Sequence, residues 1–292
     1  LLMSTCENIQ IECKDRYILS GQFYSSQKNT NHKYPILICP ATGITKGFYH
    51  SLAQWLREQG YNVLSFDFRG IGDSLHGRIQ DSKASIVQWG QLDIPAAIET
   101  LLAKTKSSKV IILGHSAGGQ LLGITPNYEK VAKVVAVAGS TGHIKGLKGR
   151  TKILAPIMFK GIFPLARFTL GYGPTNMIGM GENLPRDVAK QWAQFCSKPG
   201  YILNAIGNSV NITDNFHEKI TTPITAIWAS DDEIATEENV KDLLRLYPNS
   251  QTNLIRLNPQ TYNHKAIGHM LMFKRSHQNL WSIIENELNI NE

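Results

Sequence analysis

Hydrophobic and polar residues alternate at the start of the chain. Residues 9–13 alternate in this way, and a second extended run at 17–24 follows the polar segment Lys14-Asp15-Arg16. Successive side chains of a β-strand point to opposite faces, so alternation is typical of a strand with one buried face. Two such runs joined by a short polar segment predict an antiparallel hairpin. The polar stretch 25–33 has no periodicity and is expected to be a loop.

Continuous apolar runs replace the alternation further along the chain. Such runs are typical of strands buried on both faces of a parallel sheet. They occur at 34–39, 61–66, 110–113, 131–138, 223–229 and 253–257. Apolar residues at helical spacing occur at 48–60, 85–104, from Thr236 onwards and at 278–288. Strands that alternate with helices predict the α/β class, with a mostly parallel sheet covered by helices on both faces. In the second helix, Pro95 either causes a kink or marks the true start.

The alternation of strands and helices is interrupted between residues 139 and 219. This stretch contains scattered Gly and Pro, short helical fragments and no convincing buried strand. We therefore predict a core formed by residues 1–138 and 220–292, and an insertion formed by residues 139–219. Ligands of open α/β sheets bind at the carboxyl ends of the strands, and the insertion is expected to form a cap there.

A serine motif follows the strand at 110–113. Gly114-His115-Ser116-Ala117-Gly118 has the pattern G-x-S-x-G and precedes an apolar run that can continue as a helix. Between a strand and a helix this pattern is a nucleophile elbow, in which the serine has a strained backbone with positive φ. Gly114 and Gly118 then remove side chains that would collide across the turn. We predict that Ser116 is a nucleophile and that the N–H group of Ala117 faces a developing oxyanion.

A serine nucleophile needs a histidine to take its proton and a carboxylate to orient that histidine. Where a sheet carries such an elbow, the carboxylate and the histidine follow the serine in this order, on loops after later strands. Two loops fit, Asp231-Asp232-Glu233 and Gly268-His269-Met270. Other histidines near these motifs are His115, His264 and His277. We expect His115 to be packed within the elbow and the other two to be exposed to solvent.

With these motifs the chain resembles the α/β-hydrolase superfamily from end to end. It is most similar to the branch of serine-aminopeptidase-like and monoacylglycerol-lipase-like hydrolases. The resemblance rests on Asp67 with 70–74, on 114–118, on 231–235 and on 268–269. Segments 171–174, 179–185 and 191–193 of the insertion resemble an uncharacterised bacterial branch of predicted hydrolases. The resemblance implies an α/β-hydrolase fold with a cap and a triad of Ser116, Asp232 and His269. It favours Asp232 over Asp231, because Asp232 is the third residue after Ala229 and is followed by x-Ile-Ala.

The resemblance also implies an oxyanion hole formed by the N–H groups of Ala117 and Thr42. The superfamily usually has His-Gly where this chain has Pro40-Ala41. Proline removes only its own N–H group, so the N–H group of Thr42 survives this departure.

Composition indicates an ordinary globular protein. The chain has 292 residues, of which 42% are hydrophobic and 18% charged, and its length suits one α/β domain with an insertion. Its four cysteines, 6, 13, 39 and 196, have neither metal-site nor disulfide spacing, which favours a reducing, cytoplasmic location. The first residues show no signal-peptide pattern, and Met3 is a candidate start.

No membrane span or cofactor motif is predicted. The apolar stretch 153–172 contains Lys160, Arg167 and two prolines, which exclude it as a membrane span. Gly70-Ile71-Gly72 lacks the third glycine of a dinucleotide site and is expected to be a tight turn. We therefore expect no cofactor and no metal.

The net charge of +7 comes from one segment. Residues 130–181 contain eight basic and no acidic residues, whereas the rest of the chain has 22 basic and 23 acidic residues. The eight are Lys130, Lys133, Lys145, Lys148, Arg150, Lys152, Lys160 and Arg167. One interpretation is a solvated basic surface. The other is steering of a substrate with an anionic head and an apolar tail, or contact with an anionic membrane surface, with the apolar run 153–159 receiving an acyl chain. The segment has no recognisable nucleic-acid-binding module, so we expect no nucleic acid partner.

Four aromatic residues of the insertion, Phe159, Phe163, Phe168 and Tyr172, are expected to form the core of the cap. The alternative is that they line an acyl pocket.

We expect a capped serine hydrolase that cleaves an ester or thioester through an acyl-enzyme. One alternative is an aminopeptidase or amidase, for which Glu182 and Asp187 are the nearest carboxylates that could bind a free amine. Another is a binding protein with this fold and no activity. The acceptor of the acyl group, water or an alcohol, and the oligomeric state stay open.

Overall fold

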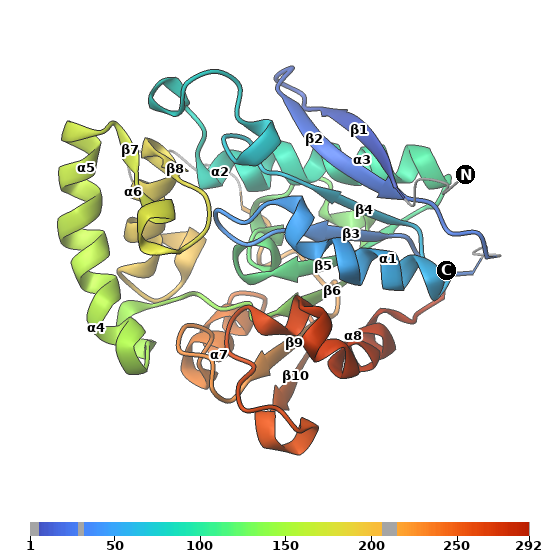
Figure 1. The fold of residues 1–292 in the computed structure, drawn as a ribbon. Coiled ribbons are helices and arrows are strands. Elements are labelled where there is room, and N and C mark those ends of the chain that lie inside the picture. Colours follow the sequence, from blue (N-terminus) through green and yellow to red (C-terminus); the bar gives the residue numbers. More distant parts are fainter. Residues whose placement is uncertain (1–5, 29–31, 206–214, 292) are drawn as a thin grey trace.

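The computed structural model describes residues 6–28, 32–205 and 215–291, and it confirms the predicted α/β fold class (Figure 1). The candidate start at Met3 lies outside the described residues. Eight strands form one sheet in the order β1-β2-β4-β3-β5-β6-β9-β10. β1 and β2 pair as the predicted antiparallel hairpin, β2 pairs with β4 antiparallel, and the remaining pairs are parallel. The strands are β1 (Glu7–Glu12), β2 (Ile18–Tyr24), β3 (Ile36–Cys39), β4 (Val63–Phe66), β5 (Val110–His115), β6 (Val131–Val137), β9 (Ile224–Ala229) and β10 (Thr252–Leu257).

Helices cover both faces of the sheet (Figure 1). Within β3, Ile36 and Ile38 pack with α1 (His50–Glu58) and α8 (Trp281–Leu288). Leu37 and Cys39 point to the other face, which α3 (Ile94–Thr105) and α7 (Glu237–Arg245) cover. The parallel strands are therefore buried on both faces, as their continuous apolar runs predict.

The helical segment predicted at 85–104 is divided in two. A short α2 (Ile86–Gln88), capped by Ser85, runs into a π-helical turn at 89–93 before α3 begins. Pro95 lies in the first turn of α3, directly after the π-helical turn. Pro95 therefore marks the start of α3, not the start of the helical segment.

The expected helix after the serine motif is absent. The described chain there forms two separate 3₁₀ turns, at 116–119 and 122–124. This segment packs closely through its glycines. A Cβ atom on Gly119 would come within 2.9 Å of the Cβ of Ala136, and one on Gly123 within 1.9 Å of the His217 ring. The chain packs closely at these two glycines and forms no regular helix here, which glycine also disfavours.

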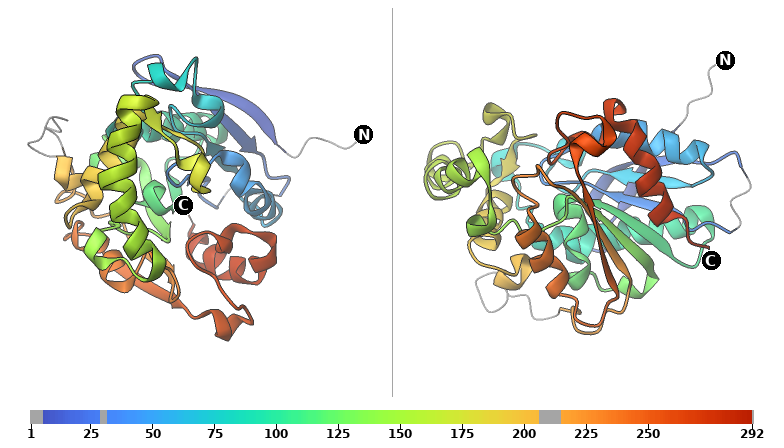
Figure 2. Two further views of the ribbon diagram at one scale, coloured as in Figure 1. Left: turned by 60° about the vertical axis from the view of Figure 1, so that its left-hand side comes forward. Right: turned by 90° about the horizontal axis from the view of Figure 1, so that it is seen from below.

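The described part of the segment between β6 and β9 lies beside one end of the sheet (Figures 1 and 2). A continuous helix is formed by α4 (Gly149–Ile157), a π-helical turn at 158–162 and α5 (Phe163–Thr169). A small hairpin of β7 (Tyr172–Gly173) and β8 (Leu184–Pro185) leads to α6 (Arg186–Cys196). Residues 206–214 of the predicted insertion lie outside the described residues.

Of the four aromatic residues predicted in the core of the insertion, Phe159 and Phe163 are buried and pack against Trp192. Tyr172 is half-buried. The prediction for Phe168 is wrong, because its side chain is 88% exposed.

Candidate active site

Five loops meet at the carboxyl edge of the sheet because β3, β5, β6, β9 and β10 are parallel. The loops after β5, β9 and β10 bring together Ser116, Asp232 and His269, which are up to 153 positions apart in the sequence. The loop after β3 contributes Thr42. The topology thus places at one edge the residues that the motifs single out.

The backbone at Ser116 has the unusual conformation that the motif predicts. Its φ is 49°, in the left-handed region that side chains rarely adopt. A Cβ atom on Gly114 would lie 2.5 Å from the carbonyl oxygen of Gly118, and one on Gly118 would lie 2.0 Å from the carbonyl oxygen of Cys39. Only glycine fits at these two positions, and the turn holds the Ser116 hydroxyl at the edge of the sheet.

A chain of hydrogen bonds joins the three side chains. His269 Nε2 lies 3.0 Å from Ser116 Oγ, and His269 Nδ1 lies 2.9 Å from Asp232 Oδ2. The other oxygen of Asp232 accepts the N–H groups of Ile234 and Ala235, each at 2.9 Å. Burial by itself raises the pKa of Asp232, but the neighbouring His269 and these N–H groups outweigh it and hold the pKa below its usual value. Asp232 is therefore a carboxylate that can accept the Nδ1–H of His269.

The neighbouring acidic residues contact other parts of the structure. Asp231 accepts the N–H groups of Gly268 at 2.9 Å and Ile267 at 3.0 Å, so it fixes the loop that carries His269. Glu233 accepts the backbone and hydroxyl groups of Thr151 in the first turn of α4. Of the two candidate aspartates, the structure therefore places Asp232 against His269.

One of the other three histidines lies where the sequence predicts, because His115 is fully buried. The prediction that His264 is exposed is wrong, because its side chain is half-buried and hydrogen-bonded to Asn279. His277 was expected to be exposed, but it is buried. Its ring stacks on that of His264 at 3.8 Å, and its Nε2 donates to the carbonyl of Ala266 at 2.7 Å. These bonds fix the same loop from its other side.

Thr42 and Ala117 both line the cavity beside Ser116. Within the described residues, neither backbone N–H group has a hydrogen-bond acceptor in the protein. The preceding N–H group, of Ala41, donates to Tyr49 Oη at 2.9 Å, which orients this loop without the usual His-Gly pair. The two free N–H groups are therefore available to an oxygen atom in the cavity.

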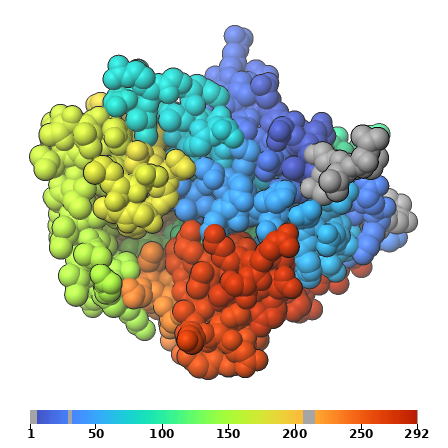
Figure 3. Space-filling model, viewed as in Figure 1, coloured from blue at the N-terminus to red at the C-terminus, as the bar shows by residue number. Residues whose placement is uncertain are grey.

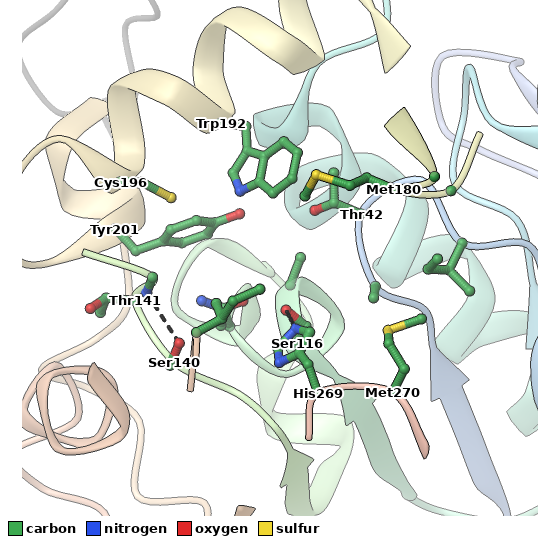
Figure 4. Close-up of a pocket in the computed structure, with 18 residues that line it drawn as sticks. Thr42, Ser116, Ser140, Thr141, Met180, Trp192, Cys196, Tyr201, His269 and Met270 are labelled. Atoms are coloured by element: carbon green, nitrogen blue, oxygen red, sulfur yellow. Dashed lines mark hydrogen bonds between the residues drawn. The ribbon is translucent and has the colours of Figure 1, made fainter. Parts of the chain in front are cut away.

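The cavity has a volume of about 220 Å³ and is lined by 18 residues (Figure 4). Met180 and Met270 lie on one side of Ser116 and His269, whereas Ser140, Thr141 and Tyr201 lie on the other (Figure 4). None of the described residues that line it is Asp, Glu, Lys or Arg. The described part of the cavity therefore suits an uncharged ligand with apolar and polar parts.

Tyr201 is a site residue that the sequence analysis did not identify. It is 2% exposed, it lines the cavity, and its hydroxyl has no hydrogen-bond partner among the described residues. Its φ of 44° is unusual for a side-chain-bearing residue, and burial raises its pKa well above the usual value. The preceding Gly200 donates its N–H group to Asp242, which also accepts the hydroxyl of Thr141. No motif marks Tyr201, so only its position in the folded chain indicates a role.

The Gly70-Ile71-Gly72 segment forms the predicted tight turn. Gly70 has a φ of 81° and Gly72 a φ of 53°. Asp67 at its start accepts the N–H group of Lys46 at 2.7 Å and pairs with its ammonium group at 2.9 Å. The turn thus supports the loop that follows β3.

Cys13, Cys39 and Cys196 are buried free thiols. Across the described ranges, no helix is long and apolar enough to cross a membrane.

Comparison with known proteins gives a consistent result. A family model described as "Serine aminopeptidase, S33" matches residues 30–262. A probable lysophospholipase L2 of Haemophilus influenzae is 22% identical over 268 residues, which cover 80% of this chain and 83% of that protein. A soluble variant of monoglyceride lipase from Saccharomyces cerevisiae has a similar structure, with a TM-score of 0.69, 16% identity and coverage of 99% of this chain and 97% of that chain. An esterase of Pyrococcus furiosus has a TM-score of 0.59 at 16% identity, covering 97% of this chain and 89% of that chain. At these identities the structural likeness shows the fold.

Proposed function

This chain belongs to the serine aminopeptidase (S33) family of α/β-hydrolases and is a hydrolase, and we propose that it cleaves a carboxylic ester or thioester through an acyl-enzyme on Ser116. The family assignment agrees with the resemblance found in the sequence. The observation that carries the proposal is the hydrogen-bonded chain from Ser116 through His269 to Asp232, beside a cavity with two free N–H groups. The names of the lysophospholipase and the monoglyceride lipase to which the chain is similar support an ester substrate.

The geometry accounts for each chemical step. His269 Nε2 takes the proton of Ser116 as Oγ attacks the carbonyl carbon, and Asp232 stabilises the imidazolium that forms. The N–H groups of Thr42 and Ala117 donate to the negatively charged oxygen of the tetrahedral intermediate. His269 then gives the proton to the departing alcohol or thiol. Water, deprotonated by the same histidine, releases the acyl group from Ser116 and restores the hydroxyl.

An aminopeptidase or amidase is the alternative on the same scaffold. A free amine on the substrate calls for a carboxylate nearby, and none lines the described part of the cavity. Glu182 and Asp187, the candidates from the sequence, do not line it. The cavity therefore supports an ester or thioester over a substrate with a free amino group. A binding protein without activity would not need the complete hydrogen-bonded triad.

The role of the basic residues in the segment 130–181 is the next question. Lys130 and Lys133 belong to the core and pair with Glu99 at 2.7 Å and Glu287 at 3.5 Å. The other six basic residues of the segment 130–181 do not line the cavity, and neither does any residue of the apolar run 153–159. These residues are thus unsuited to hold a substrate head group or acyl chain at Ser116. We propose that residues 139–219 form a cap over the site. We also propose that the basic residues of this cap contact an anionic membrane surface. The free thiols of Cys13, Cys39 and Cys196 support the proposal of a cytoplasmic location.

The test is covalent labelling combined with a substrate panel. A fluorophosphonate probe should label the wild-type protein at Ser116, and Ser116→Ala should abolish both labelling and ester hydrolysis. The panel contains chromogenic esters of several chain lengths, acyl-CoA thioesters and aminoacyl anilides. Labelling that persists in Ser116→Ala would contradict the mechanism, and faster cleavage of the anilides than of every ester would favour the aminopeptidase.

A further inference from the structure

Exposed apolar side chains are concentrated in one region of the molecule. Among the described residues, nine large hydrophobic side chains are exposed, and eight of them lie between residues 153 and 178. These eight are Ile153, Leu154, Ile157, Leu165, Phe168, Leu170, Met177 and Ile178. Single exposed apolar residues are normal in globular proteins, but a group of this size indicates a contact surface.

Most of these residues share one face of the continuous helix 149–169. Positions 150, 153, 154, 157, 160, 165 and 168 are exposed. They recur about once per turn, with a step of five residues between 160 and 165 at the π-helical turn, which places them on one side. We call this set the outer face. Ala155, Phe159 and Phe163 on the opposite side are buried in the insertion. The helix stands in front of the rest of the molecule in the left view of Figure 2, and it forms the outer edge in Figure 3. Nothing in the described chain covers the outer face.

The charged residues of the helix 149–169 are all basic. Lys148, Arg150, Lys152, Lys160 and Arg167 lie on or beside it, and the helix contains no acidic residue. None of these five side chains forms an ion pair with the described residues. A second copy of the chain would bring an equally basic surface against this one, and like charges would oppose that contact. Apolar side chains interleaved with unpaired basic ones suit a surface that is negatively charged outside and apolar beneath.

Two further exposed apolar residues, outside the helix, adjoin the lining of the cavity in sequence. Met177, 79% exposed, and Ile178 immediately precede Gly179, Met180 and Gly181, which line the cavity beside Ser116. A surface that holds residues 177–178 therefore lies next to residues that line the cavity.

We propose that the outer face, together with Met177 and Ile178, docks on an anionic phospholipid bilayer. The apolar side chains enter the boundary between head groups and acyl chains, and the basic side chains lie at the lipid phosphates. This proposal deepens the proposed function, because it names where the ester substrate is collected. The docking itself does not depend on catalysis.

Binding is measured by sedimentation with vesicles, using Ser116→Ala so that no lipid is hydrolysed. Vesicles of phosphatidylcholine alone are compared with vesicles that also contain phosphatidylglycerol. We expect binding to the anionic vesicles only, and it should weaken as salt rises. Lys152→Glu with Lys160→Glu should reduce the partition coefficient by at least about 25-fold, roughly fivefold for each basic residue lost. Leu165→Ser with Phe168→Ser should also reduce binding strongly, with no loss of thermal stability because both side chains are exposed.

Matched controls come from other parts of the chain. Leu254→Ser removes the ninth exposed apolar side chain, 39% exposed on β10, and Lys241→Glu reverses an exposed charge on α7. Both controls should bind vesicles like the parent. Equal binding of all variants, or equal binding to both vesicle types, would overturn the proposal. A wild-type dimer that Phe168→Ser dissociates would assign the outer face to self-association instead. Hydrolysis of a water-soluble ester by wild type and by the docking variants tests the proposed function separately, and these rates should be equal.

Discussion

His115 donates its Nε2–H to the backbone carbonyl of His269, with a distance of 2.8 Å between the two heavy atoms. A carbonyl oxygen can only accept, so this bond leaves Nδ1 of His115 as an acceptor, and Tyr49 donates its hydroxyl to it at 2.8 Å. The hydroxyl of Tyr49 in turn accepts the N–H group of Ala41. One buried chain of hydrogen bonds therefore links the loop of the proposed oxyanion hole to the loop of the proposed general base.

The first prediction concerns this chain of hydrogen bonds. His115→Gln should lower kcat by about 10- to 100-fold through misplacement of His269, with a smaller change in KM. Kinetics with a soluble ester measure this. His76→Gln, in which an exposed histidine is replaced, should leave kcat unchanged. Equal kcat values for wild type and His115→Gln would show that the chain of bonds does not position His269.

The second prediction concerns pH. The pKa of His115 is lowered to about 3, mainly by burial and to a smaller extent by the nearby His269. The folded protein therefore binds fewer protons here than the unfolded chain, whose histidine titrates near pH 6.5. The contribution of neutral His115 to the free energy of unfolding is therefore complete above about pH 6.5 and is lost as the pH falls toward 3. Urea unfolding at pH 7, 5.5 and 4.5 measures this. The free energy of unfolding should fall more steeply with decreasing pH for wild type than for His115→Gln. Parallel losses would contradict this account.

The third prediction separates the two neighbouring aspartates. Asp232→Asn should lower kcat by up to about 10⁴-fold, because an amide favours the wrong tautomer of His269. Asp231→Asn keeps one acceptor for the two N–H groups that Asp231 binds. It should reduce the free energy of unfolding by about 1 kcal/mol and affect kcat much less. Kinetics and thermal unfolding of both variants measure this, and a larger loss of kcat in Asp231→Asn would reverse the assignment.

The fourth prediction concerns Tyr201. Its buried hydroxyl has no partner among the described residues and faces the cavity, so we expect it to donate to an oxygen atom of the bound substrate. Tyr201→Phe should keep or raise the melting temperature, and it should raise KM for esters that carry a hydroxyl or carbonyl group beside the scissile bond. Purely apolar esters should be cleaved as before.

Tyr247→Phe is the matched control for Tyr201→Phe. The hydroxyl of Tyr247 is buried and accepts the N–H group of Gly123 at 3.1 Å. Its removal should lower the free energy of unfolding by about 1–3 kcal/mol. A similar loss of stability in both variants would show that the Tyr201 hydroxyl is already satisfied within the protein.

The fifth prediction concerns the turn at Ser116. Gly118→Ala would place a methyl group 2.0 Å from the backbone oxygen of Cys39, and we expect a loss of about 3 kcal/mol or more together with loss of activity. Gly161→Ala lies in open space within the helix 149–169 and should be neutral or stabilising by up to about 1 kcal/mol. Thermal unfolding compares the two. A stable, active Gly118→Ala protein would show that the Ser116 turn can shift.

The pattern of apolar residues was sufficient to predict the sheet. A parallel strand is buried on both faces, so its signal is a continuous apolar run that needs no partner to be recognised, and the runs at 34–39 and 110–113 correspond to β3 and β5. The serine motif was equally readable, because the positive φ of Ser116 and the close approach of Gly118 to Cys39 are local demands on residue type. The loops that carry the acid and the histidine followed from the order of residues along the chain, because both residues follow the serine on loops after later strands.

Only the tertiary structure decided which residues meet. Asp231 and Asp232 are adjacent in sequence, and just the direction of each side chain separates a backbone anchor from the partner of His269. The apolar run 153–159 has the composition of a core segment, yet its register on the helix turns Ile153 and Ile157 to solvent. Tyr201 belongs to the site because a tight turn after α6 directs it into the cavity. Local pattern specifies where strands and turns form, whereas the direction of a side chain depends on packing against residues far away in the sequence, which no local pattern records.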